Sequence, residues 1–123
     1  MKKTARQRAV ADADKWFSLY IRKRDGNRCV LCGATERIQC GHLISRGKAN
    51  TRYDEDNANA QCATCNKKHE HYPELYTQWW IEQHGKHGQE AYDDLVAKAW
   101  TVKKWTVDEL REIAVRYKWR YEN

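Results

Sequence analysis

The chain has 123 residues, 33% of them charged, with a formal net charge of +6 and an isoelectric point near 9.1. Six Trp and seven Tyr beside a single Phe argue against a disordered or low-complexity chain. No stretch approaches the roughly 20 apolar residues of a membrane span and the N-terminus lacks a signal peptide's apolar run, so we expect one soluble, intracellular domain.

The N-terminal part of the sequence predicts a helix over about residues 5–24, followed by a turn at "DGN" and then by "RCVLCGA". The last segment is typical of a zinc knuckle, a tight turn that presents two thiolates. Apolar residues recur at helical spacing in the first helix: Val10, Ala13, Phe17, Tyr20 and Ile21.

Two short strands are expected next, with a polar connection between them. "RIQCGHLI" is the first strand, "SRGKANTRYDEDN" the connection and "ANAQC" the returning strand. The segment "ATCNKKHEHY" has no strand character and predicts a helix that begins near Cys65. This order, two strands followed by a helix, predicts an α+β fold.

The C-terminal third predicts three helices. Pro73 suits the first turn of one helix, which Gly85 ends, and "GQEAYDDLVAKAW" forms the second. Thr106 with Glu109 is a capping box for the third. The apolar face of that third helix comprises Leu110, Ile113, Ala114 and Tyr117. We therefore expect a single domain with an N-terminal helix, a zinc core over about residues 28–71 and a helical extension over about residues 73–121.

Four of the five cysteines form two Cys-x-x-Cys pairs, Cys29 with Cys32 and Cys62 with Cys65. Two such turns can complete a tetrahedral shell of four thiolates around Zn²⁺. A closed shell has no open position, so this zinc would be structural. Cys40 is left over and is expected to be a small buried residue.

Basic residues gather in "MKKTARQR", "IRKRDGNR", "NKKH" and "RYKWR". Each cluster alone fits a solvated face equally well, but four of them beside many aromatic residues favour a nucleic-acid partner. Five residues that flank the predicted core are the first candidates for DNA contacts: Arg22, Lys23, Arg24, Lys67 and Lys68.

A structural zinc needs no histidine in the strand between the cysteine pairs, yet His42 is there. Asn57 precedes the second strand, and Asn66 directly follows Cys65. His, Asn and Asn at these offsets resemble the motif of the HNH (ββα-metal, or His-Me finger) endonucleases. The resemblance implies a zinc-clamped ββα-metal core and divalent-metal-dependent hydrolysis of phosphodiesters.

The resemblance assigns a role to each of the three residues. A neutral His42 would accept the proton of the attacking water, Asn57 would orient the imidazole, and Asn66 would hold Mg²⁺ or Mn²⁺. HNH enzymes commonly carry another ligand directly before the histidine, where this chain has Gly41. Two residues on the face of the predicted helix that carries Asn66 could replace that ligand, with the first preferred: Glu70 and His69.

A narrower resemblance extends from about residue 16 to residue 117. "FSLYIRKRDGNRCVLCGA", "GHLISRG", "RYDEDNANAQCATCN" and "WTVDELREIAVRYK" are similar to the phage NinG (Rap) family of recombination endonucleases, which shares the glycine before the histidine. The resemblance implies a phage- or prophage-encoded enzyme that cuts branched DNA, such as Holliday junctions and D-loops, in the cytoplasm of a bacterial host. A homodimer would suit this activity, because resolving a junction needs two symmetric cuts and the aromatic C-terminal helices could supply an interface.

Two other functions fit parts of the sequence. An HNH nuclease that cuts linear duplex DNA would carry the same motif. A non-catalytic zinc-ribbon module would explain the cysteines and the positive charge, but it leaves His42, Asn57 and Asn66 without a role.

Overall fold

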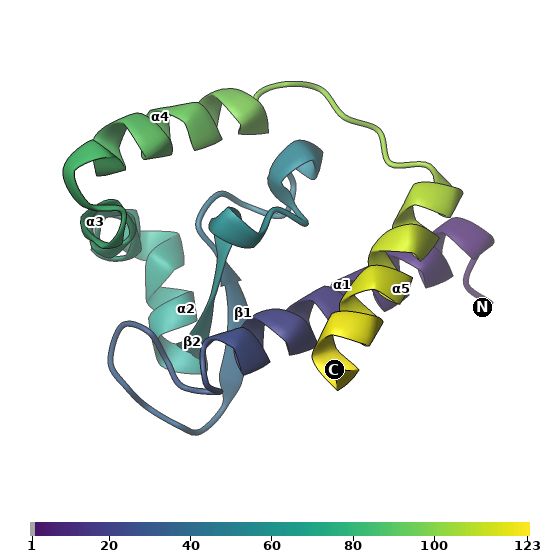
Figure 1. Ribbon diagram of the computed structural model, residues 1–123, viewed down its shortest axis with the longest axis horizontal. Helices are drawn as coiled ribbons and strands as arrows, with labels where there is room; N and C mark the ends of the chain where they lie inside the picture. Colours follow the sequence, from purple (N-terminus) through teal and green to yellow (C-terminus); the bar gives the residue numbers. More distant parts are fainter. Residues whose placement is uncertain (1) are drawn as a thin grey trace.

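The computed structural model describes residues 2–123, which form five α-helices, three short 3₁₀ helices and one two-stranded sheet (Figure 1). None of the helices in this range is both long and apolar enough to cross a membrane. The elements in chain order are α1 (Ala5–Arg24), β1 (Ile38–His42), η1 (Ala49–Thr51), η2 (Glu55–Asn57), β2 (Ala58–Cys62), α2 (Ala63–His71), α3 (Pro73–Gln83), η3 (Gly85–His87), α4 (Gly88–Ala99) and α5 (Val107–Glu122).

The predicted helix and strand positions are confirmed where local signals were strong. The capping box that begins α5 forms as expected, with the Thr106 hydroxyl accepting from the Glu109 backbone and the Glu109 carboxylate accepting from the Thr106 backbone. A second capping box, which the sequence analysis did not identify, pairs Thr4 with Gln7 at the start of α1. Pro73 occupies the first turn of α3, where its missing N–H costs nothing.

The two strands pair antiparallel, with Ile38 opposite Cys62 and His42 opposite Ala58. Because side chains alternate between the faces of a strand, Cys40 and His42 share one face and Gln39 and Gly41 share the other. The first face lies against α1, where the rings of Phe17 and His42 have centroids 6.0 Å apart. The helix α2 follows β2 directly, so that the sheet and this helix form a compact ββα unit (Figure 1).

The main core lies between the first and last helices, which run side by side in Figure 1. Phe17 of α1 makes edge-to-face contacts with Tyr53 and with Tyr117 of α5. The three helices of the predicted extension over residues 73–121 therefore pack in two places, because α5 returns to α1 while α3 and α4 form a separate cluster. The buried face of α1 explains the pairing: Ala9, Ala13, Phe17 and Ile21.

The helices α3 and α4 cover the other side of the ββα unit and form a second, smaller cluster. Tyr76 and Trp80 of α3 pack with Leu95 of α4 and with Leu43, the residue that follows β1. The indole N–H of Trp80 also donates to the carbonyl oxygen of Asp56 at 2.6 Å. The segment between the strands is thus held on one side by α3 and α4 and on the other by α1 and α5.

Candidate functional site

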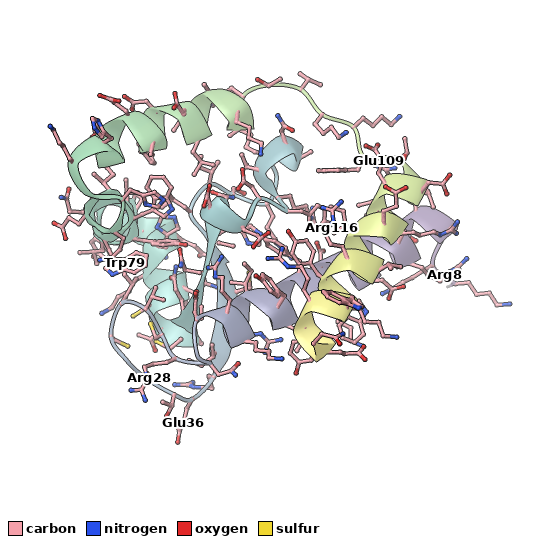
Figure 2. All side chains as sticks on the ribbon, viewed as in Figure 1. Arg8, Arg28, Glu36, Trp79, Glu109 and Arg116 are labelled. Atoms are coloured by element: carbon pink, nitrogen blue, oxygen red, sulfur yellow. The ribbon has the colours of Figure 1, made fainter. Side chains whose placement is uncertain are left out.

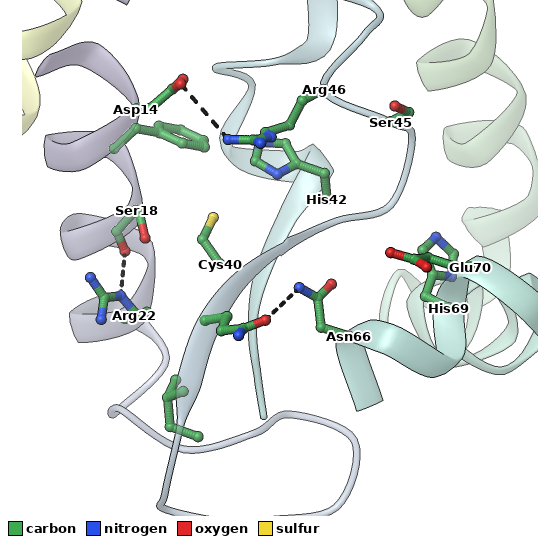
Figure 3. A pocket seen from close by; sticks show the side chains of 13 residues that line it. Asp14, Ser18, Arg22, Cys40, His42, Ser45, Arg46, Asn66, His69 and Glu70 are labelled. Atoms are coloured by element: carbon green, nitrogen blue, oxygen red, sulfur yellow. Dashed lines mark hydrogen bonds and ion pairs between the residues drawn. The ribbon is translucent and has the colours of Figure 1, made fainter. Parts of the chain in front are cut away.

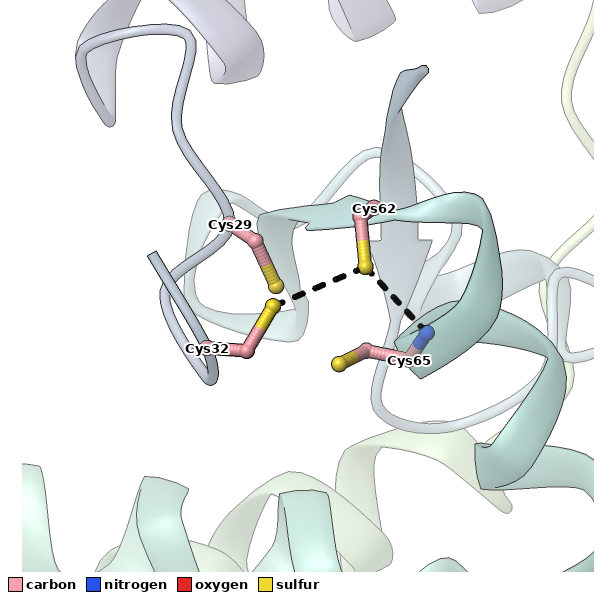
Figure 4. Close-up of side chains that lie close together, drawn as sticks. All are labelled: Cys29, Cys32, Cys62 and Cys65. Atoms are coloured by element: carbon pink, nitrogen blue, oxygen red, sulfur yellow. Dashed lines mark hydrogen bonds between the residues drawn. The ribbon is translucent and has the colours of Figure 1, made fainter. Parts of the chain in front are cut away.

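The four paired cysteines come together beside the start of α2 (Figure 4). The first knuckle is a tight turn, closed by hydrogen bonds from the Cys29 backbone to Ala34 and from the Gly33 backbone to Cys29, each 2.9 Å long. The Val30 backbone donates to Ala60 of β2 at 3.0 Å and so anchors the knuckle to the sheet. Cys62 ends β2 and caps α2, which places its thiol next to the first turn of that helix.

The geometry of these thiols fits one tetrahedral zinc ion. Their sulfur atoms all lie within 4.8 Å of one another, and those of Cys32 and Cys62 are 3.7 Å apart. With Zn–S bonds of about 2.3 Å, tetrahedral geometry requires sulfurs about 3.8 Å apart. Burial raises the pKa of the Cys29 thiol, but hydrogen bonds from the backbone of Cys62, Cys32 and Leu31 outweigh it and bring this pKa to about 7. The cluster could therefore hold a structural zinc, as the spacing predicts.

An open cleft of about 730 Å³ lies along β1, between α1 and α2 (Figure 3). Its walls bring together His42 from the end of β1, Asn66 and Glu70 from α2, and Arg22 from α1. Cys40 also lines this cleft and stands apart from the four-cysteine cluster. Burial raises the pKa of the Cys40 thiol to about 12, so that it stays protonated.

A backbone carbonyl fixes the protonation pattern of His42. The Nε2 atom lies 2.9 Å from the Arg52 carbonyl oxygen. A carbonyl oxygen only accepts hydrogen bonds, so Nε2 carries the proton and Nδ1 keeps its lone pair. Burial is the largest cause of the shift and lowers the pKa of His42, the hydrogen bond to the Arg52 carbonyl raises it, and the charges of Arg46 and Arg52 lower it, so that the net shift is downward. The imidazole is therefore neutral near pH 7 and has one acceptor nitrogen.

Asn57 does not orient the imidazole directly, in contrast to the prediction. Its side-chain oxygen accepts from the Ile44 backbone at 2.8 Å, and its amide nitrogen donates to the carbonyls of Ile44 and Thr51 at 2.9 and 3.1 Å. Asn57 is fully buried, so these bonds replace its lost contacts with water. This residue fixes the segment between the strands, which in turn supplies the Arg52 carbonyl to His42.

The absence of a side chain at Gly41 leaves room for Asn66. A Cβ atom at position 41 would lie 2.6 Å from the amide nitrogen of the buried Gln61 and 3.1 Å from Oδ1 of Asn66. The Nδ2 atom of Asn66 donates to the side-chain oxygen of Gln39 at 2.9 Å (Figure 3). That bond uses one N–H of the amide group and directs Nδ2 to Gln39, so that Oδ1 is the atom beside Gly41 and can act as an acceptor.

The two candidates for a further ligand differ in the structure. Glu70 is exposed and lines the cleft, so its carboxylate is accessible. His69 also lines the cleft, but its Nε2 donates to the Leu43 carbonyl at 2.8 Å and its Nδ1 is buried. Within residues 2–123 the buried Nδ1 has no hydrogen-bond partner, so it is the one ring nitrogen of His69 that could bind an ion, whereas the carboxylate of Glu70 is exposed to the cleft.

Three further candidates for a functional role lie in or beside the cleft and were not predicted from the sequence: Asp14, Arg46 and Arg52. The Asp14 carboxylate pairs with the Arg52 guanidinium at 2.6 Å and with the Arg46 guanidinium at 3.8 Å. One signal could have identified Asp14, since this acid stands in the apolar stripe of α1, between Val10 and Phe17 at helical spacing. No comparable local signal distinguishes Arg46 and Arg52 from other basic residues.

The basic residues predicted to contact DNA fall into different classes. Arg22 lines the cleft, and Lys67 and Lys68 are exposed on α2. Arg24 instead donates to the carbonyls of Glu55 and Ala58 at 2.9 and 2.6 Å and pairs with Asp25, so its guanidinium is engaged within the fold. Lys23 donates to the carbonyl of Tyr121 at the C-terminal end of α5. Other basic side chains project far apart, such as Arg8 and Arg28 in Figure 2.

Residues 1–123, the whole chain, match the family described as Bacteriophage Lambda NinG protein. The chain belongs to the NinG family. It is 30% identical over 112 residues to protein ninG of Escherichia phage 933W and 28% identical to protein ninG of Escherichia phage lambda.

These alignments cover 88% of this chain but only 54% and 53% of the two phage proteins. The chain thus spans about half the length of the curated relatives that it matches. No solved structure matches the chain.

Proposed function

We propose that this NinG family protein is a divalent-metal-dependent endonuclease that hydrolyses phosphodiester bonds in DNA. In this proposal β1, β2 and α2 form an HNH (ββα-metal) core, the four cysteines hold its structural zinc, and the cleft along β1 receives the scissile phosphate. The net charge of +6 favours a polyanionic substrate.

The observation that carries the proposal is the state of His42. A general base near neutral pH must be uncharged and must offer a lone pair to the proton that it abstracts. The Arg52 carbonyl holds the proton on Nε2, and burial and nearby positive charge lower the pKa, so both conditions are met. A water beside Nδ1 would lose its proton to this nitrogen as it attacks phosphorus.

Asn66 and Glu70 would hold the divalent ion. Both line the cleft with His42, and the Gln39 contact leaves the Asn66 side-chain oxygen as an acceptor. Amide and carboxylate oxygens are the ligands that Mg²⁺ prefers. When bound, the ion would supply positive charge against the phosphorane and the departing 3′ oxygen. Two protein ligands suit Mg²⁺, which usually keeps several of its waters.

Branched DNA is the proposed substrate, and this part of the proposal depends on the NinG family membership and the resemblance to recombination endonucleases. The cleft is open and lies between two helices that carry basic residues, which suits a bulky substrate more than a small molecule. Resolution of a four-way junction needs two symmetric cuts, so the proposal includes a homodimer on that substrate.

The test is cleavage of a labelled four-way junction and of a linear duplex of the same sequence, each with and without Mg²⁺ or Mn²⁺. We expect metal-dependent cleavage of the junction in preference to the duplex. Equal cleavage of both substrates would favour a nuclease for linear duplex. Binding without cleavage under all metal conditions would overturn the nuclease proposal and leave a zinc-dependent binding module.

Variants identify the reacting residues in the same assay. His42→Ala should keep its fold and DNA affinity but cleave roughly 10²–10⁴-fold more slowly, the usual contribution of a positioned acid–base group. His87→Ala is the matched control, because His87 is exposed and lies outside the cleft. The rate of Asn66→Ala should recover in part as the metal concentration rises, whereas that of His42→Ala should not.

A further inference from the structure

A chain of contacts connects α1 to the imidazole of His42. The Asp14 carboxylate accepts from Nε and one terminal nitrogen of Arg52, at 3.0 and 2.6 Å. It also accepts from the hydroxyl of Tyr53 at 2.9 Å. Charge-assisted, bidentate contacts of this kind are among the strongest that side chains make, and they fix the guanidinium in one plane.

Arg52 uses both its side chain and its backbone. Its guanidinium is bound to α1 through Asp14, while its carbonyl oxygen is the partner of Nε2 of His42. The next residue, Tyr53, is buried between Phe17 and Trp105 and also bonds to Asp14. Two successive residues of the connecting segment are thus anchored to one carboxylate, and the peptide group between them contains the carbonyl that meets the imidazole.

We propose that Asp14 is a positioning residue for His42: by holding Arg52 and Tyr53 it keeps the Arg52 carbonyl at Nε2 and so leaves Nδ1 as the acceptor that faces the reaction. This inference rests on the proposed nuclease function for its kinetic consequence, but its structural consequence is independent of any activity. In this role Asp14 acts through Arg52 and Tyr53 and does not touch the substrate. Its negative charge, which would repel a phosphate, is neutralised by Arg52.

A second role for Asp14 would have a different signature. Asp14 lies 3.8 Å from Arg46, an exposed cation at the cleft. If Asp14 acted mainly by restraining Arg46, its loss would free a phosphate-binding arginine and change KM. If Asp14 positions His42, its loss lowers kcat and leaves KM nearly unchanged, since the general base acts only in the chemical step.

The structural test is the tautomer of His42 in Asp14→Asn, read from imidazole ¹⁵N chemical shifts at neutral pH. The wild type should show the proton on Nε2, and the variant should show a mixture of the two tautomers. Asp12→Asn is the matched control, because Asp12 lies on the same helix, is exposed and has no ion pair within residues 2–123. Wild-type shifts in Asp14→Asn would overturn the proposal, whether or not the protein cleaves DNA.

The kinetic test is a double-variant cycle on the preferred DNA substrate. Asp14→Asn should lower kcat by up to about 100-fold, the scale of losses from a misplacement near 1 Å. Because Asp14 acts through Arg52, adding Arg52→Gln to Asp14→Asn should lower kcat only a little further. If the two residues had independent roles, the two decreases in kcat would multiply.

Asp14→Glu keeps the charge but displaces the carboxylate, and it replaces Asp14→Asn in both tests if that variant does not fold. A normal kcat and wild-type ¹⁵N shifts in this variant would equally contradict the proposal. If the wild type cleaves no DNA, the nuclease function fails, and the ¹⁵N shifts alone decide the positioning role.

Discussion

The four cysteines come from two short segments, residues 29–32 and 62–65, whereas the His42 cleft takes its walls from α1, β1, the segment between the strands and α2. The first site closes when two turns meet at the end of one sheet. The second needs the Asp14–Arg52 contact, 38 residues apart in sequence, and the buried amide of Asn57. Each cysteine pair therefore depends on the local geometry of one turn, and one strand pairing brings the two turns together, whereas the cleft depends on packing among several elements.

Removing one thiol of the four-cysteine cluster should have the largest effect of the changes considered. Cys62→Ser should lose the zinc and unfold the domain, because structural zinc contributes on the order of 10–16 kcal/mol and whole domains are stable by only about 5–15 kcal/mol. Zinc content and circular dichroism measure both effects. Cys40→Ser is the control, and it should retain the metal. Loss of zinc from that control, or full zinc content in Cys62→Ser, would refute the four-cysteine assignment.

Gly41 tests the packing behind the cleft. Gly41→Ala should destabilise the fold by roughly 1–3 kcal/mol, the usual cost of overpacking, because the new Cβ would lie 2.6 Å from the buried Gln61 amide. Gln61→Ala in the same background should restore part of this loss. Gly47→Ala is the matched control, since its Cβ would meet only the Ser45 hydroxyl at 3.5 Å. Urea unfolding measures all three, and equal stability of Gly41→Ala and the wild type would contradict the contact.

The pH profile tests the environment of His42. Its pKa is lowered by burial, so the neutral form persists to a lower pH than for a free histidine near 6.5. The acid limb of kcat/KM should therefore have its midpoint below 6.5 and fall about tenfold per pH unit beneath it. Because the folded pKa is depressed, the stability due to neutral His42 is present above 6.5 and is lost as pH falls through the folded pKa. An acid limb centred above 6.5 would be inconsistent with this site.

The salt dependence of DNA affinity should show the smallest effect, and it compares arginines of the cleft with an arginine that is bonded within the fold. Arg22→Ala and Arg46→Ala should each reduce the slope of log K against log salt by about 0.9, the value for one phosphate contact. Arg24→Ala should leave the slope unchanged and lower the melting temperature, because Arg24 bonds to backbone carbonyls. Equal slopes for all three variants and the wild type would show that Arg22 and Arg46 do not contact phosphates and are only solvated.

Several features follow from the sequence because their causes lie within a few residues. A threonine and a glutamate three positions apart begin α5, a proline begins α3, and the two Cys-x-x-Cys pairs predict the metal cluster. Each of these signals is a hydrogen bond, a fixed dihedral angle or a turn that forms between near neighbours. Tertiary contacts were not needed to predict them.

Other features became visible only in the tertiary structure. The sequence predicts His42 and Asn66 as site residues, but it does not show that the hydrogen-bond partner of the imidazole is a backbone carbonyl, because a carbonyl has no sequence signature. The return of α5 to α1 and the bond from Arg52 to Asp14 join segments that are far apart in the chain. Which distant segments meet depends on the burial of apolar faces and on the pairing of partly buried charges across the whole domain. Neither can be assessed from neighbouring residues alone.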